Sequence, residues 1–519
     1  MNRRDWTIHL ADQDASPAPF DAFVFRRNPW RYSPLALRRQ GSISLRLSPS
    51  LSAMPSSSPL APRHLLSASL PPMTPRRVAV IGAGAAGLVS ARELRREGHR
   101  VVVFERGGSV GGTWVYTPAV ESDPLSLDPA REVVHSSLYE SLRTNLPRES
   151  MGFLDYPFVT HHRRGNDDGE GDPRRFPSHA EVLRYLEDFA RDFDLYGLVR
   201  FWTEVGQVER EEDGRWAVRS RRVRGGDGGD ESEVYDAVVV CNGHFTEPRV
   251  ADIPGIDAWP GKQIHSHNYR VPKPFIDQVV VVIGSSASAH DISRDISGSA
   301  KEVHIASRSA LVGTPNKLPG YGNVWLHSMV ESANEDGHVV FQDGSSVHVD
   351  VIMHCTGYRY SFPFLKTNGI VNVDDNRVGP LYKHIFPPEL APCLSFIGTP
   401  WKVLPFPTFE LQSKWVAGVL SGRIALPTQE EMMEDVKAFY LQMVVDGWPK
   451  RYTHNLTKFQ FEYFDWLAHE CGYPAVEEWR KQMYEAAAEN RRDHPESYRD
   501  EWDDDHLVAE AQRDFQKFL

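Results

Sequence analysis

The chain has 519 residues, of which 41% are apolar and 25% are charged, enough for about two to four domains of an ordinary globular protein. Its net charge of −12 argues against nucleic-acid binding, which usually requires a basic face. No apolar run approaches the ~20 residues of a membrane span, and the four cysteines stand far apart, so we expect no membrane span, no metal site and no redox cysteine pair.

Residues 1–73 do not read as part of a fold. They are rich in arginine, lack lysine, and contain no acidic residue after Asp21. Such a composition is typical of an organelle transit peptide. The alternative is a disordered leader, or an upstream extension with the start at Met54 or Met73. The expected location is the cytoplasm, or a plastid or mitochondrion if the segment is a transit peptide.

The next residues predict a strand, a helix and a second strand. The apolar run 78–81 is typical of a parallel strand that is covered on both faces. Residues 86–97 have a helical composition, and Gly98 is well placed to end the helix. Residues 100–105 read as the following strand. This order of elements predicts an α/β fold.

Two further patterns follow in the first half of the chain. Residues 178–193 have apolar side chains at helical spacing, and Ser178 with Glu181 is predicted to form a capping box at the start of that helix. The runs 215–220 and 234–241, separated by a glycine-rich loop, are predicted to pair as a hairpin.

The turn between the first strand and its helix carries the glycine pattern of a dinucleotide-binding loop. Gly82 permits the tight turn, Gly84 lets the backbone approach a pyrophosphate, and Gly87 lets the helix pack on the strand. Glu105 ends the next strand, where an acid can bind ribose hydroxyls. The turn at 111–114 wraps the FAD side in two-loop flavoproteins, or is an ordinary loop with a packed tryptophan. The residues expected to bind this cofactor are Gly82, Ala83, Gly84, Ala85, Ala86, Gly87, Glu105, Gly112, Thr113 and Trp114.

A second strand–loop–helix–strand unit spans 278–307. It lies between two similar segments, "VVVCNGHF" (238–245) and "VIMHCTGY" (351–358), which indicate two crossings into and out of an inserted domain. The sequence therefore predicts two Rossmann-type dinucleotide-binding domains: one formed by 74–243 and 355–519, the latter with C-terminal helices, and a smaller one at 244–354 inserted in it.

The second loop keeps Gly284 but has Ser286 and Ala289 in place of the other two glycines. Alanine is tolerated at the third position, and the serine hydroxyl can still donate to a phosphate oxygen. The next strand ends in Ser307 and Arg308 rather than in an acid. Arginine pairs with a 2′-phosphate that an acid would repel, which favours NADPH over NADH; an ordinary surface arginine is the alternative. The residues expected to bind NADPH are Gly284, Ser285, Ser286, Ala287, Ser288, Ala289, Ser307 and Arg308.

Together, the two loops and the residues between them resemble the flavin-containing monooxygenases over about 78–421. The family fingerprint FxGxxxHxxxY/F is matched with tryptophan in place of its leading phenylalanine. The segments "SLYESLRTNLPRESMGFLDYPF" (137–158) and "IHSHNYRVP" (264–272) are most similar to the plant S-oxygenating branch, which includes the glucosinolate S-oxygenases. The fingerprint positions are Trp259, Gly261, His265 and Tyr269.

The resemblance implies an FAD- and NADPH-dependent monooxygenase, with FAD on the larger domain and NADPH on the inserted one. NADPH would reduce FAD, O2 would give a C4a-hydroperoxyflavin, and a small thioether, such as a methylthioalkyl compound, or an amine would take the distal oxygen. Asn145 matches the family asparagine beside the flavin and NADP+, which makes it the implied catalytic residue. His265 is expected to shape the domain junction rather than to act as a base.

Several alternatives share parts of this pattern. A Baeyer–Villiger monooxygenase would have tryptophan where this chain has Tyr269, and a disulfide reductase would need a redox cysteine pair. Auxin-forming plant monooxygenases have similar loops but fit the quoted segments less well. An uncoupled NADPH oxidase, or a cofactor-binding protein that has lost turnover, stays open because of Ser286 and Ala289.

Overall fold

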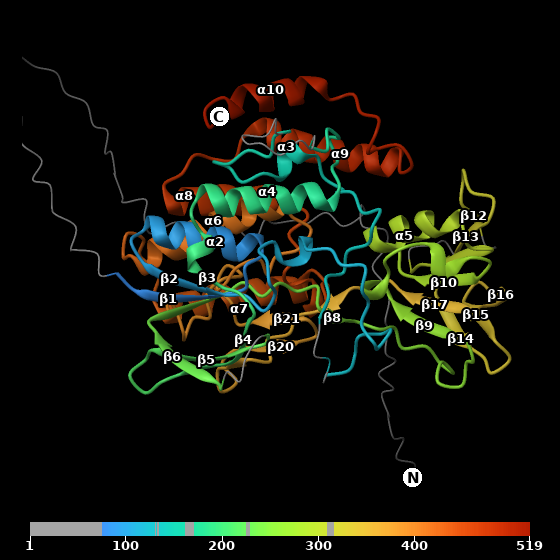
Figure 1. Cartoon of the computed structure of the whole chain (residues 1–519), viewed down its shortest axis with the longest axis horizontal. Helices are drawn as coiled ribbons and strands as arrows, with labels where there is room; N and C mark the ends of the chain where they lie inside the picture. Colours follow the sequence, from blue (N-terminus) through green and yellow to red (C-terminus); the bar gives the residue numbers. More distant parts are fainter. Residues whose placement is uncertain (1–74, 130, 132–133, 161–170, 225–228, 309–315) are drawn as a thin grey trace, which may run out of the picture. The chain divides into compact units, whose positions relative to one another are not determined.

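The computed structural model describes residues 75–519 apart from 130, 132–133, 161–170, 225–228 and 309–315; the predicted leader at 1–73 lies outside the described residues. The chain forms two compact units (Figure 1). The core unit comprises 75–115, Arg143–His244 and Tyr360–Leu519, and the inserted unit comprises Tyr116–Leu142 and Phe245–Arg359. Among the helices in the described ranges, none has the length and apolar character needed to cross a bilayer.

The core unit is built on a five-stranded parallel sheet. Its strands lie in the order β22–β7–β1–β2–β3. Side chains of β1 alternate between two apolar cores: Val78 and Val80 face one, Ala79 and Ile81 the other. This confirms the predicted strand covered on both faces. The strands are β1 (Arg77–Ile81), β2 (Arg100–Phe104), β3 (Val199–Arg200), β7 (Ala237–Val240) and β22 (Leu394–Phe396).

Helices cover one face of this sheet and a second, four-stranded sheet covers the other (Figure 1). The helix α2 packs most extensively against α6, which is buried along most of its length. The four-stranded sheet has the order β19–β4–β5–β6. The helices of this layer are α2 (Ala85–Arg96), α3 (Arg148–Met151), α4 (His179–Asp192), α6 (Pro405–Leu420), α7 (Gln429–Val445) and α8 (Gln460–Cys471). The helices α9 (Glu478–Asp493) and α10 (Asp505–Phe515) pack on each other around a separate apolar cluster. The strands of the second sheet are β4 (Thr203–Arg210), β5 (Trp216–Arg222), β6 (Glu231–Tyr235) and β19 (Leu365–Lys366).

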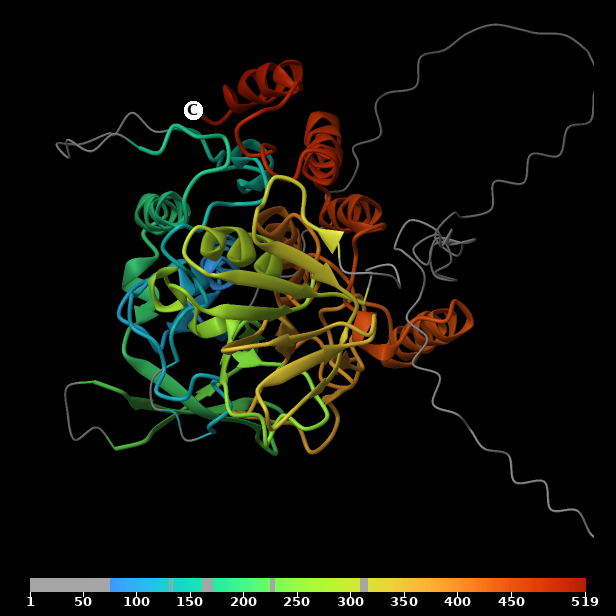
Figure 2. The ribbon, with the colours of Figure 1, turned by 90° about the vertical axis from the view of Figure 1, so that its right-hand side faces the viewer.

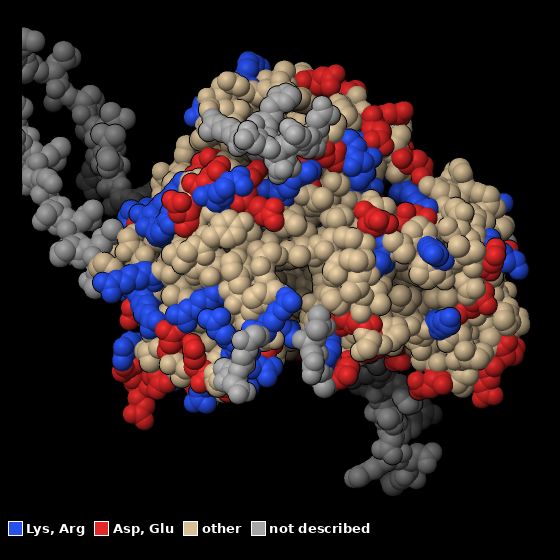
Figure 3. Space-filling view, viewed as in Figure 1, with Lys and Arg blue, Asp and Glu red and all other residues tan. Residues whose placement is uncertain are grey.

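The helix α4 begins where the sequence predicts, but its predicted capping box is wrong. The Ser178 side chain makes no capping hydrogen bond, and its backbone N–H donates to the Asp172 carboxylate at 2.8 Å. Glu181 instead accepts from the Asp172 backbone N–H at 3.1 Å and pairs with Arg184. The nearby aspartate thus outcompetes the local partner. Ion pairs of this kind, on α4 and also between Arg96 and Glu93 of α2, place basic and acidic side chains side by side (Figure 3).

The predicted hairpin is confirmed only in its first part. β5 pairs antiparallel with β6. The chain then breaks at Asp236, whose carboxylate accepts from the Arg77 backbone N–H at 2.6 Å, and continues as β7 in the parallel sheet. One apolar run therefore serves two different sheets, because an aspartate turn divides it.

The inserted unit repeats this design at a smaller size (Figure 2, green to yellow). A parallel sheet in the order β13–β11–β10–β17–β9, with β12 antiparallel at its edge, has α5 on one face and the antiparallel sheet β14–β15–β16 on the other. Its elements are β9 (Lys262–His265), β10 (Val279–Ile283), α5 (Ala287–Ser297), β11 (Glu302–Ala306), β12 (Asn316–Lys317), β13 (Val324–His327), β14 (Val330–Ala333), β15 (His338–Phe341), β16 (Ser346–His348) and β17 (Val351–His354).

The segment Tyr116–Leu142 belongs to the inserted unit, which differs from the predicted domain ranges. Polar side chains attach it there. Glu121 is hydrogen-bonded to His267 at 2.8 Å, its backbone N–H donates to the Asn268 side chain at 3.0 Å, and Arg270 donates to the carbonyl oxygen of Ala119 at 3.0 Å. An irregular segment held by such contacts has no apolar periodicity from which its location could be predicted.

This attachment predicts an acid-sensitive inserted unit. Burial alone would raise the pKa of Glu121, but its hydrogen bond and charge interaction with His267, and the nearby Arg131, lower it from 4.5 to about 2. The stabilisation is present above the unfolded pKa of 4.5 and is lost as the pH falls towards 2. We expect Glu121→Gln to lower the free energy of unfolding at pH 7 by about 2 kcal/mol and to flatten its decline in acid.

Urea unfolding at several pH values measures this effect. The matched control is Glu140→Gln, because Glu140 is an exposed carboxylate of the same segment. Equal stability of the two variants at pH 7 would contradict the prediction.

Candidate cofactor-binding site

The first glycine turn lies at the carboxyl end of β1 in the core unit. Gly82 has a φ of +104°, and a Cβ there would lie 2.6 Å from the carbonyl oxygen of Cys241. A Cβ at Gly87 would lie 1.8 Å from the carbonyl oxygen of Gly82, which shows how closely α2 approaches the turn. Gly84 is the N-cap residue of α2, so the unpaired N–H groups of the first helical turn are available to a phosphate beside these glycines.

A second turn in the core unit packs against the first. The backbone N–H of Gly111 donates to the carbonyl oxygen of Ala83 at 3.0 Å, and a Cβ at Gly112 would lie 2.8 Å from the Cα of Gly84. Gly112 and Thr113 are exposed, and Trp114 is half-buried against the main core. The structure thus brings the two predicted turns into contact through their backbones.

Glu105, directly after β2, is held beside the first turn. Its Oε2 accepts from the backbone N–H of Ala83 at 2.8 Å, and its Oε1 accepts from that of Gly107 at 2.6 Å. Burial raises the pKa of this carboxyl group, and the two backbone donors oppose that shift. The acid stands where a dinucleotide fold places the ribose, and ribose binding stays a prediction.

Two other turns share this edge of the sheet, because parallel strands end on the same side. Gly243 follows β7 and Gly398 follows β22. The backbone N–H of Gly398 donates to Oε1 of Gln412 at 2.9 Å, and Nε2 of Gln412 donates to the Tyr463 hydroxyl at 2.9 Å. The sequence marks Gly243 only as part of the crossing at 238–245, and Gly398 was not predicted to lie at the site, although a glycine shortly after an apolar run was a visible signal.

The second loop has the same backbone build in the inserted unit. Gly284 has a φ of +121°, and a Cβ there would lie 2.5 Å from the carbonyl oxygen of Cys355. Ser286 is the N-cap residue of α5 with φ −98° and ψ −172°, close to the −73° and −176° of Gly84. An extended backbone accepts any residue, so serine costs no strain here. Ala289 is fully buried, and the exposed loop residues are Ser285, Ser286, Ala287 and Ser288.

Ser307 occupies the place that Glu105 has in the core unit. The Ser307 backbone N–H donates to the carbonyl oxygen of His327 at 3.0 Å, just as that of Glu105 donates to Arg200 at 3.0 Å. Ser307 is buried, whereas Arg308 is exposed. The acid at the end of the strand is therefore replaced by a neutral side chain, followed by an arginine.

Asn145 and His265 occupy different surroundings. Asn145 is half-buried in the core unit, just before α3, and its amide makes no hydrogen bond within the described ranges. His265 is fully buried in the inserted unit, where its ring bonds to the carbonyl oxygen of Gly357 at 3.1 Å. Burial, with His267 and His354 nearby, lowers the pKa of His265 to about 3, so the ring is neutral at pH 7. Its role in shaping the domain junction stays a prediction.

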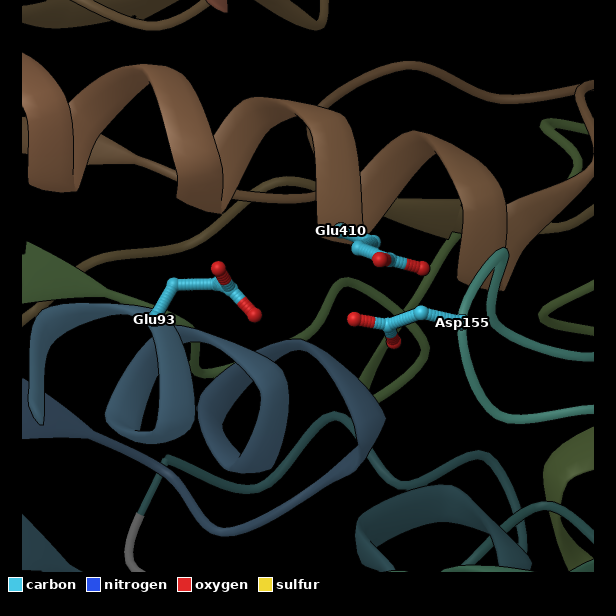
Figure 4. A group of neighbouring side chains, drawn as sticks. All are labelled: Glu93, Asp155 and Glu410. Carbon is cyan, nitrogen blue, oxygen red and sulfur yellow. The ribbon is translucent and has the colours of Figure 1, made fainter. Parts of the chain in front are cut away.

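Three carboxylates converge between α2 and α6 and resemble a metal site (Figure 4). They are Glu93, Asp155 and Glu410. Arg92 contacts them at 2.8, 2.7 and 3.3 Å, and Lys414 at 3.2, 3.7 and 3.1 Å. Arg96 adds a third cation. Because three cations already compensate three acids, this group is a buried ion-pair network of the core, and its composition does not favour a metal ion.

Each of the two parallel sheets has a strand, β1 or β10, that leads through a glycine turn into the N-terminus of a helix. This arrangement defines a protein with two dinucleotide-binding domains. The flavin-binding monooxygenase-like family matches residues 75–314 and 312–473. The chain is 63% identical to flavin-containing monooxygenase FMO GS-OX-like 2 and 63% identical to FMO GS-OX5, both from Arabidopsis thaliana, over 86% and 84% of its length and 96% and 94% of theirs.

A solved structure agrees with these matches. The chain has a TM-score of 0.82 and 66% identity to S-allyl-L-cysteine S-oxygenase from Allium sativum, covering 86% of this chain and all of that one. The chain belongs to the flavin-binding monooxygenase-like family, and it is an FAD- and NADPH-dependent monooxygenase. The predicted fold class and the resemblance to the plant S-oxygenating branch are confirmed.

Proposed function

We propose that this enzyme transfers one oxygen atom from O2 to the sulfur of small thioethers, with methylthioalkyl compounds and S-alkenyl cysteines as the substrate class. One observation carries the proposal: the chain covers the whole of an S-allyl-L-cysteine S-oxygenase at 66% identity. The similarity to FMO GS-OX-like 2 and FMO GS-OX5 supports the same class, because the resemblance predicted from the sequence is to the plant S-oxygenating branch.

In this proposal the residues of the chain bind and orient the two cofactors. The N-terminus of α2 and the glycine turn hold the FAD pyrophosphate, and Glu105 holds its ribose. When bound and reduced by NADPH, FAD would supply an electrophilic oxygen derived from O2. Overall, a thioether, O2, NADPH and a proton give a sulfoxide, NADP+ and water. Asn145 offers an amide that can donate and accept at the flavin without changing charge.

The test is oxygen transfer by the FAD-loaded full chain under 18O2. We expect S-allyl-L-cysteine and a methylthioalkyl amine to give sulfoxides carrying one 18O atom, detected by mass spectrometry. A trialkylamine substrate tests N-oxygenation in parallel. NADPH consumption that yields only H2O2 with every thioether would contradict the proposal. If the N-oxide forms faster than the sulfoxides, the substrate class is amines rather than thioethers.

Arg308 is proposed to bind the 2′-phosphate of NADPH, because it is exposed directly after the buried Ser307 at the end of β11. We expect Arg308→Ala to raise the Kd for NADPH about 10- to 100-fold, as for loss of a charge-assisted hydrogen bond, and to leave NADH binding unchanged. Titration of each dinucleotide measures this.

The control for this variant is Lys301→Ala. Lys301 is an exposed cation just before β11, at the opposite end of the same strand. An equal loss of NADPH affinity in both variants would point to general charge attraction and would contradict a specific role of Arg308.

A further inference from the structure

Residues 474–519 contact the segment of the chain that carries Asn145. The family match ends at residue 473, and the residues after it form α9 and α10. Within the core unit, α9 packs on α3, the short helix that follows Asn145 (Figure 1). These contacts join positions more than three hundred residues apart in the sequence.

Arg480 of α9 is the main connection. It is fully buried, and its Nη1 donates to three carbonyl oxygens, those of Glu149 at 3.2 Å, Ser150 at 3.0 Å and Gly152 at 3.3 Å. Glu477 accepts from its Nε at 2.8 Å and balances its charge. One guanidinium thus satisfies the carbonyl groups at the end of α3, which have no intrahelical partners.

Arg499, in the loop between α9 and α10, holds the other end of the segment. Its Nε donates to the carbonyl oxygen of Thr144 at 2.9 Å, the residue just before Asn145. In return, Arg143 donates to the carbonyl oxygen of Arg499 at 3.1 Å and pairs with Asp500 at 2.8 Å. The backbone is therefore held by hydrogen bonds from arginine side chains on both sides of Asn145.

The Asn145 amide has no hydrogen bond of its own within the described ranges, so its position depends on its backbone. We propose that residues 474–519 are a positioning element for Asn145, and that Arg480 and Arg499 are its positioning residues. The inference rests on the proposed function, in which Asn145 lies at the flavin. Once the backbone is released, oxygen transfer to sulfur gives way to the side reaction of NADPH, O2 and a proton to NADP+ and H2O2.

The experiment compares Arg499→Gln and Arg480→Gln with the control Arg492→Gln in the FAD-loaded full chain. Arg492 lies on α9 like Arg480, but its side chain is 60% exposed and pairs only at the surface. Three quantities are measured: hydrogen exchange of the amides in 143–152, the H2O2 released per NADPH oxidised, and the fluorescence of bound FAD.

We expect amide exchange in 143–152 to rise at least about tenfold in Arg499→Gln, with a larger share of NADPH lost as H2O2 and altered flavin fluorescence. Arg492→Gln should match the unaltered protein. Arg499→Gln keeps the proposal testable if Arg480→Gln fails to fold, because Arg499 is only half-buried in a loop.

Unchanged exchange in Arg499→Gln would overturn the inference. Faster exchange with unchanged coupling and unchanged flavin fluorescence would also overturn it, because the contacts would then be structural only. Sulfoxide formation by the unaltered chain is measured alongside. Its absence counts against the proposed function, whereas the exchange measurement still reports on the arginine contacts.

Discussion

Replacing Gly87 with alanine is expected to yield a protein that purifies without FAD. The added Cβ would lie 1.8 Å from the carbonyl oxygen of Gly82 and 2.9 Å from its carbonyl carbon. Both obstructing atoms belong to the backbone, so the added methyl group would force α2 away from the glycine turn that precedes it. Such overpacking costs about 3 kcal/mol, and it displaces the helix N-terminus from the pyrophosphate.

The ratio of absorbance at 450 nm to that at 280 nm in the purified protein reports FAD content, and thermal unfolding reports stability. The matched control is Ala289→Gly at the equivalent position of α5. This change should cost about 1 kcal/mol for a helical glycine and leave the FAD content intact. A fully yellow Gly87→Ala protein would show that the close approach of helix and strand is not required.

The second large effect is expected from Arg92→Met in the buried ion-pair network. Arg92 contacts Glu93, Asp155 and Glu410, and both Arg92 and Glu410 are fully buried. Without it, three carboxylates face only Lys414 and Arg96. Removing one member of a buried network leaves uncompensated charge, which costs about 3–5 kcal/mol.

The same variant should extend the loss of stability with rising pH to higher pH values. Burial, and repulsion by Asp155, already raise the pKa of Glu410 to about 7, and removal of a cation raises it further. A raised folded pKa contributes stability that is full below the unfolded value and is lost as the pH rises. The free energy of unfolding of Arg92→Met should therefore fall between about pH 5 and pH 8.

Urea unfolding at pH 6 and pH 8 measures both effects. Arg96→Met is the matched control, because the Arg96 side chain is 41% exposed. Water can replace much of its interaction with the carboxylates, so we expect a loss of about 1 kcal/mol in the free energy of unfolding. An equal loss of unfolding free energy in the two variants would mean that burial does not determine how much these ion pairs stabilise the protein.

The sequence by itself determined the two dinucleotide-binding units. The strand–turn–helix patterns at β1 and β10 were readable because a parallel strand covered on both faces must be apolar throughout, and because a tight turn beside a helix requires glycine. The observed bounds, Arg77–Ile81 and Val279–Ile283, fall where those patterns lie. The family resemblance came from the same local signals and was confirmed by the comparisons.

The N-terminal caps of the helices show where prediction from a short sequence pattern failed. The pattern at Ser178 and Glu181 predicted a capping box, but Asp172 displaced it. The same pattern at Thr428 and Glu431 does form one, at the start of α7. Four residues of sequence cannot reveal which side chain outside them competes for a backbone N–H, so the pattern alone does not decide between the two outcomes.

Only the tertiary structure decided which segments belong together. It placed Tyr116–Leu142 in the inserted unit, paired Arg92 with Asp155 and Glu410, and brought Arg480 and Arg499 to the segment of Asn145. These contacts are polar, and each joins residues that the sequence keeps far apart. Apolar periodicity records which face of an element is buried, whereas the partner of a buried charge is set by the packing of the whole unit.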